Sequence, residues 1–164
     1  MKILVLSDSH ATLRIMRSAV DAIKPDAIIH LGDFFDDGEV IREENPQIPF
    51  YSVPGNCDRN RMYQPRPEAL CCAVCGVRIY MTHGHNHNVK LSLYSLVQDA
   101  REYGVQAALF GHTHAPHCEL ADGLWILNPG SCGNGCGTVG LIETVNGRIL
   151  NCRVLRQEEW EELS

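Results

Sequence analysis

Short apolar runs and helical spacing alternate along the first third of the chain. Three apolar runs have the length of buried strands, at residues 3–6, 27–31 and 50–53. Between the first two, apolar residues recur at helical spacing from Leu13 to Ile23, with Thr12 as the expected N-cap and Pro25 beyond the end. An acidic segment at 36–44 is a second expected helix. This order predicts βαβ units.

The rest of the chain favours strands. Residues 69–74 and 77–82 flank the turn pair Cys75-Gly76 and predict a hairpin, and Asp122-Gly123 and Asn146-Gly147 predict two more. A helix is expected at 90–103 with Gly104 as its stop, followed by a strand at 105–110. The closing stretch QEEWEELS is expected to be a solvated end. Without repeats or linkers, residues 1–164 are predicted to form a single domain of the α/β class.

The polar residues that follow the apolar runs are of metal-ligand type. In chain order these are Asp8-Ser9-His10, Asp33, Asn56, His83-Gly84-His85 and His112-Thr113-His114. Sites in open α/β sheets form outside the carboxyl ends of the strands, so we expect the five loops to lie side by side.

The spacing within two of these loops carries further information. In an extended chain, residues two apart point the same way, so Asp8 and His10 can face one pocket, and so can His112 and His114. Each feature alone has an ordinary structural explanation, such as a helix cap or a turn residue. Together, the carboxylates and imidazoles at one rim would be desolvated and mutually repelled unless cations joined them.

Seven candidate ligands exceed what one tetrahedral ion needs. They are Asp8, His10, Asp33, Asn56, His83, His112 and His114. The set suits two ions that share a bridging carboxylate. Nitrogen and oxygen ligands without thiolates fit manganese, iron, zinc, cobalt or nickel rather than calcium or magnesium. The residues therefore predict a dinuclear site for divalent transition metals, with manganese as the first expectation.

Composition narrows the partners. The net charge of −6 argues against binding to a nucleic-acid backbone, which needs Lys and Arg. No apolar run approaches the roughly 20 residues of a membrane span, and no secretory segment opens the chain, so no membrane association and a cytoplasmic location are expected. The eight cysteines lack zinc-ribbon spacing and are expected to be reduced and mostly buried, with no assigned role.

The same residues resemble the calcineurin-like metallophosphoesterase superfamily, whose motifs run D-x-H, G-D, G-N-H-D/E, G-H or H-G, and G-H-x-H. Here they read SDSH at 7–10, LGD at 31–33, GNCD at 55–58, THGH at 82–85 and GHTH at 111–114. The match spans residues 1 to about 131. The short length and the stretches THGH, GHTHAP and LNPGS are most similar to the small YfcE-type phosphodiesterases, a group that also includes the eukaryotic retromer scaffold subunit.

The resemblance implies a fold and a ligand assignment. The fold is a four-layer α/β/β/α sandwich with two mixed β-sheets. Asp8, His10 and His114 would hold one ion and Asn56, His83 and His112 the other, and Asp33 would bridge both. The implied activity is hydrolysis of a small phosphodiester by a metal-bridging hydroxide that attacks phosphorus directly, with Asn56 also stabilising the phosphoryl oxygens.

Two departures from the superfamily pattern affect the mechanism. Larger members carry His where this chain has Cys57, whereas small members often lack it; Cys57 is expected to fill space and Asp58 to orient its loop. His85 is then the candidate that protonates the leaving group. The alternative is that its imidazole only supports a metal ligand or lies at the surface. The stretch CGNGCG at 132–137 lacks the Pro-Arg of many relatives, which puts an arginine clamp on the substrate in doubt.

Two alternatives remain open from sequence. A phosphomonoesterase would use the same site, and a protein-interaction scaffold would have lost ligands, whereas all seven positions are filled here. A homodimer is compatible with the group. Substrate specificity is expected to lie in residues 59–66 and 132–137.

Overall fold

The structure is a computed structural model that describes residues 1–59, 66–133, 135 and 137–162. Of the two stretches expected to set specificity, residues 60–65, 134 and 136 lie outside the described residues. Within the described part, ten strands and four α-helices form two five-stranded sheets with helices on their outer faces.

The first sheet has the order β10-β9-β1-β2-β3. Its strands are β1 (Lys2–Leu6), β2 (Ala27–His30), β3 (Phe50–Ser52), β9 (Thr138–Val145) and β10 (Arg148–Arg156). Strands β1, β2 and β3 are parallel and are joined through α1 (Leu13–Ile23) and α2 (Phe35–Glu44). Strand β9 pairs antiparallel with β1, and β10 pairs antiparallel with β9. The parallel part is the pair of βαβ units that the apolar runs predict.

The second sheet has the order β4-β5-β6-β8-β7. Its strands are β4 (Ala69–Val74), β5 (Val77–Thr82), β6 (Ala107–Leu109), β7 (His117–Ala121) and β8 (Leu124–Asn128). Strands β5, β6 and β8 are parallel, and β4 and β7 are the antiparallel edges. Both sheets are therefore mixed. The three hairpins are confirmed, because Cys75, Asp122 and Asn146 adopt the left-handed conformation before a glycine that such turns require.

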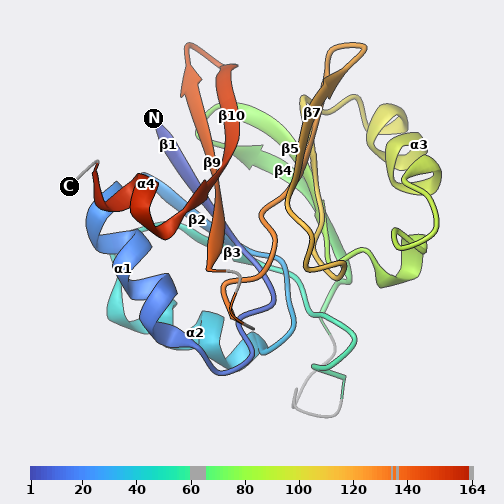
Figure 1. Ribbon diagram of the computed structural model, residues 1–164. Helices are drawn as coiled ribbons and strands as arrows, with labels where there is room; N and C mark the ends of the chain where they lie inside the picture. Colours follow the sequence, from blue (N-terminus) through green and yellow to red (C-terminus); the bar gives the residue numbers. More distant parts are fainter. Residues whose placement is uncertain (60–65, 134, 136, 163–164) are drawn as a thin grey trace.

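The two sheets pack face to face, with α1, α2 and α4 (Gln157–Glu161) outside the first and α3 (Tyr94–Glu102) outside the second (Figure 1). Three apolar clusters fill the spaces between the layers. The central one joins Ile3 and Val5 of β1 to Ile79 and Met81 of β5, and the other two lie under α1 and under α3. The predicted α/β/β/α sandwich is thus confirmed. Among the described residues, no helix has the length and apolar character needed to cross a membrane.

Two sequence expectations are wrong. The helix expected at 90–103 begins only at Tyr94, because the preceding residues form turns whose backbone N–H groups bond back to Gly84, His85 and Asn88. The expected solvated end is wrong at one residue, because α4 buries Trp160 completely against α1, while its described glutamates are exposed and residues 163–164 lie outside the described residues. The Trp160 indole N–H donates to the Ser18 hydroxyl at 3.2 Å. One apolar side chain among acidic neighbours anchors the last helix.

Candidate metal centre

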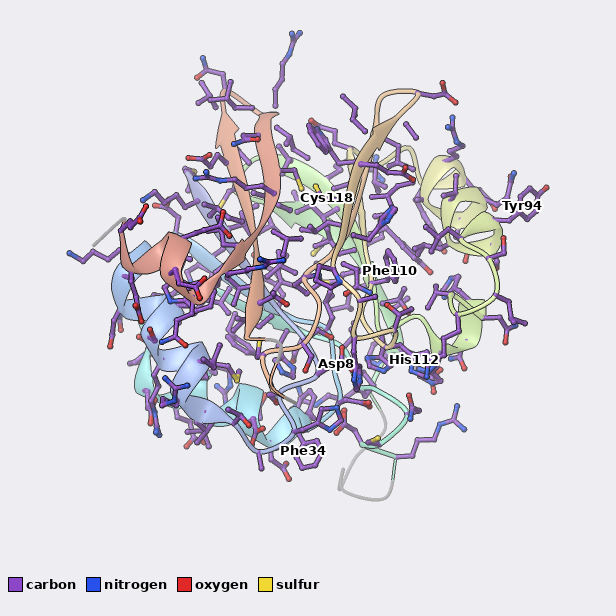
Figure 2. All side chains as sticks on the ribbon, in the orientation of Figure 1. Asp8, Phe34, Tyr94, Phe110, His112 and Cys118 are labelled. Carbon is purple, nitrogen blue, oxygen red and sulfur yellow. The ribbon has the colours of Figure 1, made fainter. Side chains whose placement is uncertain are left out.

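The polar loops that follow the parallel strands meet at one end of the two sheets, where Asp8 and His112 lie close together (Figure 2). Hydrogen bonds join loops from different strands. The Asp8 N–H donates to Gly32 O at 3.0 Å, and the His112 N–H donates to Asp8 Oδ2 at 3.1 Å. The second bond joins the loop after β6 to the loop after β1, and therefore links the two sheets. The expectation that the loops lie side by side is confirmed.

Four candidate metal ligands lie close together in one half of this rim. Single ligand atoms of Asp8, His10, Asp33 and His114 all lie within 4.8 Å of one another. His10 Nε2 and His114 Nε2 are 3.3 Å apart, and His114 Nε2 is 3.1 Å from Asp8 Oδ1. Asp8 is fully buried, its Oδ2 accepts from the Ser7 hydroxyl at 2.6 Å, and its Oδ1 has no hydrogen-bond partner. We call Asp8, His10 and His114 the first half-site.

The electrostatics of the first half-site favour a cation between its groups. Burial raises the pKa of Asp8 to about 6, although the Ser7 hydroxyl opposes this shift. Burial and then the charge of His114 lower the pKa of His10. A neutral His10 offers a lone pair, so the first half-site presents a nitrogen acceptor close to the buried carboxylate of Asp8. A divalent ion would satisfy this arrangement.

The other half of the rim is built on His83. Its Nδ1–H donates to the Leu31 carbonyl at 2.8 Å, which leaves Nε2 as the lone-pair nitrogen, 3.5 Å from Asp33 Oδ1. His83 is fully buried, and burial lowers its pKa to about 4. The buried Nε2 has no hydrogen-bond partner. The rings of His83 and His112 are 5.1 Å apart. We call His83, His112 and Asn56 the second half-site.

Asp33 lies between the halves and is held by the loop after β3. Its Oδ1 accepts from the Cys57 N–H at 2.9 Å. The Asp58 carboxylate accepts from the N–H groups of Asp33, Phe35 and Gly55 at 2.8–3.0 Å, so Asp58 orients the loop as expected. Burial raises the pKa of Asp33, but His83 and the Cys57 hydrogen bonds lower it more, and the net shift is downward. The lowered pKa keeps Asp33 ionised at neutral pH, as its predicted bridging role would require.

Cys57 differs from expectation, whereas the role expected for its neighbour Asn56 stays a prediction. Both are exposed, and the Asn56 amide lies 3.5 Å from Cys57 Sγ. Cys57 does not fill space in the core; its backbone N–H and its thiol both hydrogen-bond Asp33. Burial and then Asp33 raise the pKa of the Cys57 thiol, which opposes a thiolate nucleophile. The seven described cysteines are free, as expected, but only Cys132 and Cys152 are buried.

The backbone brings these ligands together by a route that differs from the extended chain assumed from the spacing. Positive φ angles occur at Asp8 (54°), His10 (45°), Asp33 (56°), His112 (66°) and His114 (58°). The two-residue spacing argument is therefore wrong in its geometry, since each loop turns back over the rim as soon as its strand ends. Left-handed residues other than glycine cost about 1–3 kcal/mol each and concentrate at functional sites.

The remaining histidines divide between the mouth of the site and the scaffold. His85 lies beside the second half-site, its ring 5.5 Å from that of His83 and 6.1 Å from that of His112. His30 is packed in β2. His87 and His117 are half-buried. His87 Nε2 lies 3.0 Å from Asp99 Oδ2, so it connects the loop after β5 to α3, and His117 begins β7.

Comparison with known proteins agrees with this geometry. The model of the calcineurin-like phosphoesterase superfamily domain matches residues 1–146. The chain belongs to this superfamily.

Sequence relatives of this metallophosphoesterase include bacterial and archaeal proteins. A Bacillus subtilis protein named "Probable metallophosphoesterase YsnB" is 30% identical over 134 residues, which are 80% of this chain and 75% of the relative. A Methanocaldococcus jannaschii protein named as a phosphodiesterase is 26% identical over 166 residues, covering 88% of this chain and 93% of the relative. A crystal structure from Streptococcus pneumoniae, described as a "predicted phosphoesterase", has a TM-score of 0.74 and 27% identity, and covers 96% of this chain and 90% of that one.

Two charged residues at the mouth were not singled out from sequence. An Arg59 guanidinium nitrogen lies 3.5 Å from His85 Nε2 and 3.5 Å from Glu68 Oε1, and Glu68 Oε2 lies 3.9 Å from His85 Nε2. Burial lowers the pKa of His85, Glu68 opposes the shift and Arg59 adds to it. Glu68 lies ahead of β4 and carries no motif. Arg59 directly follows GNCD and opens the 59–66 stretch that is expected to set specificity, although no individual role was assigned to it.

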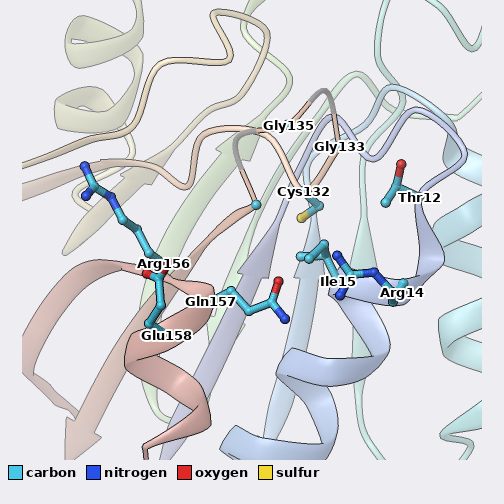
Figure 3. Close-up of a pocket in the computed structure, with 10 residues that line it drawn as sticks. Thr12, Arg14, Ile15, Cys132, Gly133, Gly135, Arg156, Gln157 and Glu158 are labelled. Atoms are coloured by element: carbon cyan, nitrogen blue, oxygen red, sulfur yellow. The ribbon is translucent and has the colours of Figure 1, made fainter.

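A separate pocket of about 300 Å³ opens between the N-terminal ends of α1 and α4 (Figure 3). It is lined by Arg14, Arg156 and the backbone of Cys132 and Gly133, among others, and none of the seven candidate ligands lines it. The Cys132 and Gly133 N–H groups donate to the carbonyls of Ser7 and Asp8 at 3.0 and 3.3 Å. The wall of this pocket therefore supports the first half-site from behind.

Proposed function

We propose that this metallophosphoesterase is a dinuclear metal-dependent phosphodiesterase that hydrolyses small phosphodiesters. One observation carries the proposal: Asp8 Oδ1 and His83 Nε2 are buried with no hydrogen-bond partner among the described residues, and they lie 3.1 Å from His114 Nε2 and 3.5 Å from Asp33 Oδ1. Cations would satisfy both atoms, and the ligands on offer are carboxylate and imidazole, the set that transition metals prefer. The phosphodiesterase relative supports the reaction class.

The ligand assignment follows the two half-sites. Asp8, His10 and His114 are proposed to hold one ion, His83 and His112 with Asn56 the other, and Asp33 to bridge them. When bound, two divalent ions supply an activated water and positive charge for an in-line displacement. Manganese is proposed as the working metal, with nickel, cobalt, zinc and iron as alternatives.

The residues themselves supply orientation and proton transfer. The Leu31 carbonyl fixes the His83 tautomer, so that Nε2 faces the site. Asp58 fixes the loop that positions Asp33 and Asn56. His85, at the open side of the second half-site, is proposed to donate a proton to the departing oxygen. Neutral His10 and His83 match the protonation state that binding of ions requires.

The test is to remove metal with a chelator and titrate manganese while following hydrolysis of bis(p-nitrophenyl) phosphate. Activity is expected to rise and saturate near two ions per chain, and to exceed the activity on the monoester p-nitrophenyl phosphate. A higher rate on the monoester would instead assign a phosphomonoesterase. Tight binding of two ions with no turnover of either ester would contradict the proposed activity and favour a scaffold role.

His85 can be tested separately, because general acids typically contribute 10²–10⁴-fold. His85→Ala is expected to lower kcat by about this factor for esters with a poor leaving group, and much less for p-nitrophenyl esters, whose leaving group needs little protonation. Equal losses for both kinds of ester would show that His85 is not the proton donor.

A further inference from the structure

The mouth of the site is electrostatically asymmetric. Beside the second half-site lies the cation Arg59, 3.5 Å from His85 Nε2 and paired with Glu68. Beside the first half-site lie the Phe34 ring, at 5.1 Å from the His10 ring, and the carboxylate of Asp37, which accepts from Ser9 and Ala11. The chain carries a net charge of −6, so the cation Arg59 on one side of the rim has a charge opposite to that of the protein as a whole.

The position of Arg59 relative to the ions follows from the rings between them. Its guanidinium lies 3.5 Å from His85 Nε2, on a ring that is itself 5.5 and 6.1 Å from those of His83 and His112. Arg59 is thus one imidazole farther out than the ligands of the second half-site. A group bound to Arg59 would lie beyond the phosphoryl group, on the His85 side, where the proposed proton donor faces the departing oxygen.

The contacts that the Arg59 side chain makes within the protein are also weak. Its side chain is 61% exposed, and its ion pair with Glu68 spans 3.5 Å, between two side chains that are both more than a third exposed. Pairs of this kind contribute little to stability. The planar guanidinium suits bidentate binding of a carboxylate or phosphate group. An anion from the substrate could therefore replace Glu68 at small expense to the fold.

We infer that Arg59 is a specificity-determining residue that binds a negative charge on the leaving group, so that the preferred substrates are phosphodiesters whose leaving group carries its own carboxylate or phosphate. The inference rests on the proposed phosphodiesterase function. It also supplies, from the loop after β3, the arginine contact that the stretch at 132–137 lacks in this chain.

The experiment compares two chromogenic esters, methyl 4-nitrophenyl phosphate and methyl 3-carboxy-4-nitrophenyl phosphate, which differ in one carboxylate on the leaving group. The manganese-loaded wild type is expected to favour the carboxylated ester by about tenfold in kcat/KM, a charge-assisted contact discounted for exposure. Arg59→Ala is expected to bring this ratio within about twofold of unity, and Arg59→Lys to retain part of it. Glu68→Gln should keep or raise the ratio, because it removes the competing carboxylate.

Arg101→Ala is the matched control, because Arg101 is an exposed arginine on α3 that pairs with Asp122. It should leave the ratio unchanged. A ratio that Arg59→Ala does not alter, or no preference in the wild type, would overturn the assignment.

A second arm needs no turnover. Calorimetry measures how tightly the manganese-loaded protein binds the product anion 5-hydroxy-2-nitrobenzoate. We expect this binding to weaken several-fold in Arg59→Ala and not in Arg101→Ala. Absence of hydrolysis in the wild type, with this difference intact, would count against the proposed function while supporting the anion site. Equal binding in both variants would count against Arg59 alone.

Discussion

The two half-sites are assembled to different degrees. In the first, the ligand atoms of Asp8, His10 and His114 lie within 4.8 Å of each other and of Asp33. In the second, His83 is rigidly oriented by the Leu31 carbonyl, whereas Asn56 is exposed and lies 3.5 Å from Cys57 Sγ. The first half-site is closed by the loops after β1 and β6, and the second depends on the loop after β3.

Because of this difference, the two half-sites of one rim can bind their ions with unequal affinity. A set of donors already in position loses little conformational entropy on binding, whereas an exposed side chain such as Asn56 must first be ordered. We therefore expect the first half-site to bind its ion more tightly. The second, more open half-site faces His85 and Arg59, so it is the side at which a substrate and its leaving group can be accommodated.

The largest expected effect comes from the residue that the halves share. Asp33→Asn removes the bridging charge while it keeps the shape, and should lower kcat/KM by about 10³-fold or more, since several kcal/mol of charge stabilisation are lost and each 1.4 kcal/mol is tenfold. Metal analysis of the dialysed variant should show weaker binding of both ions. Retention of near wild-type activity, or loss of only one ion, would show that Asp33 belongs to one half alone.

A smaller effect should separate the halves. His114→Ala removes a ligand of the first half-site and His112→Ala a ligand of the second, and each should weaken one ion by at least the 10–100-fold that loss of a supporting partner costs. Manganese titration by calorimetry should then lose the tighter event in His114→Ala and the weaker event in His112→Ala. The same event lost in both variants would contradict the two-half description.

The order of the elements and the identity of the rim residues could be predicted from sequence, because both depend on local signals. Apolar runs of strand length, turn pairs such as Cys75-Gly76 and polar residues directly after each run predicted the βαβ units, the hairpins and one cluster of candidate ligands. The two-sheet sandwich was implied only by the family resemblance. The burial of Trp160 could not be predicted, because it depends on α1, which lies more than a hundred residues away in sequence. The charged residues around it indicate a surface segment.

The local backbone geometry of the site was harder to predict from sequence than the identity of its residues. Spacing rules assume a regular backbone, and Asp8, His10, His112 and His114 all leave it with positive φ. Asp and His adopt such angles more often than most residues, but their identity alone does not say which of them will, because tertiary hydrogen bonds decide it; the His112 N–H to Asp8 Oδ2 bond is one example. The same limit applies to Arg59, whose proximity to His85 joins two loops after different strands.

The smallest effect on activity, and the sharpest control for the comparison, is expected at His30, which lies beneath the rim. Burial lowers its pKa from 6.5 to about 4. As pH falls through 6.5 the unfolded chain takes up a proton at this residue and the folded chain does not, so the free energy of unfolding decreases by about 1.4 kcal/mol per pH unit, about 3 kcal/mol in all, until the folded pKa is reached. Above pH 6.5 the contribution of His30 is constant.

His30→Asn removes this titration and keeps an oxygen that can accept from the Gly32 N–H, as His30 Nδ1 does at 3.3 Å. Urea unfolding of the metal-free protein between pH 4 and 7 should therefore show a shallower pH dependence in the variant. The raised pKa of Asp8 acts in both proteins and cancels in the difference. Manganese-dependent kcat at pH 7 should change less than twofold, because His30 offers no ligand to either half. An identical pH dependence in both proteins would mean that His30 does not stay neutral in the folded state, and a large loss of kcat would extend the site beneath the two half-sites.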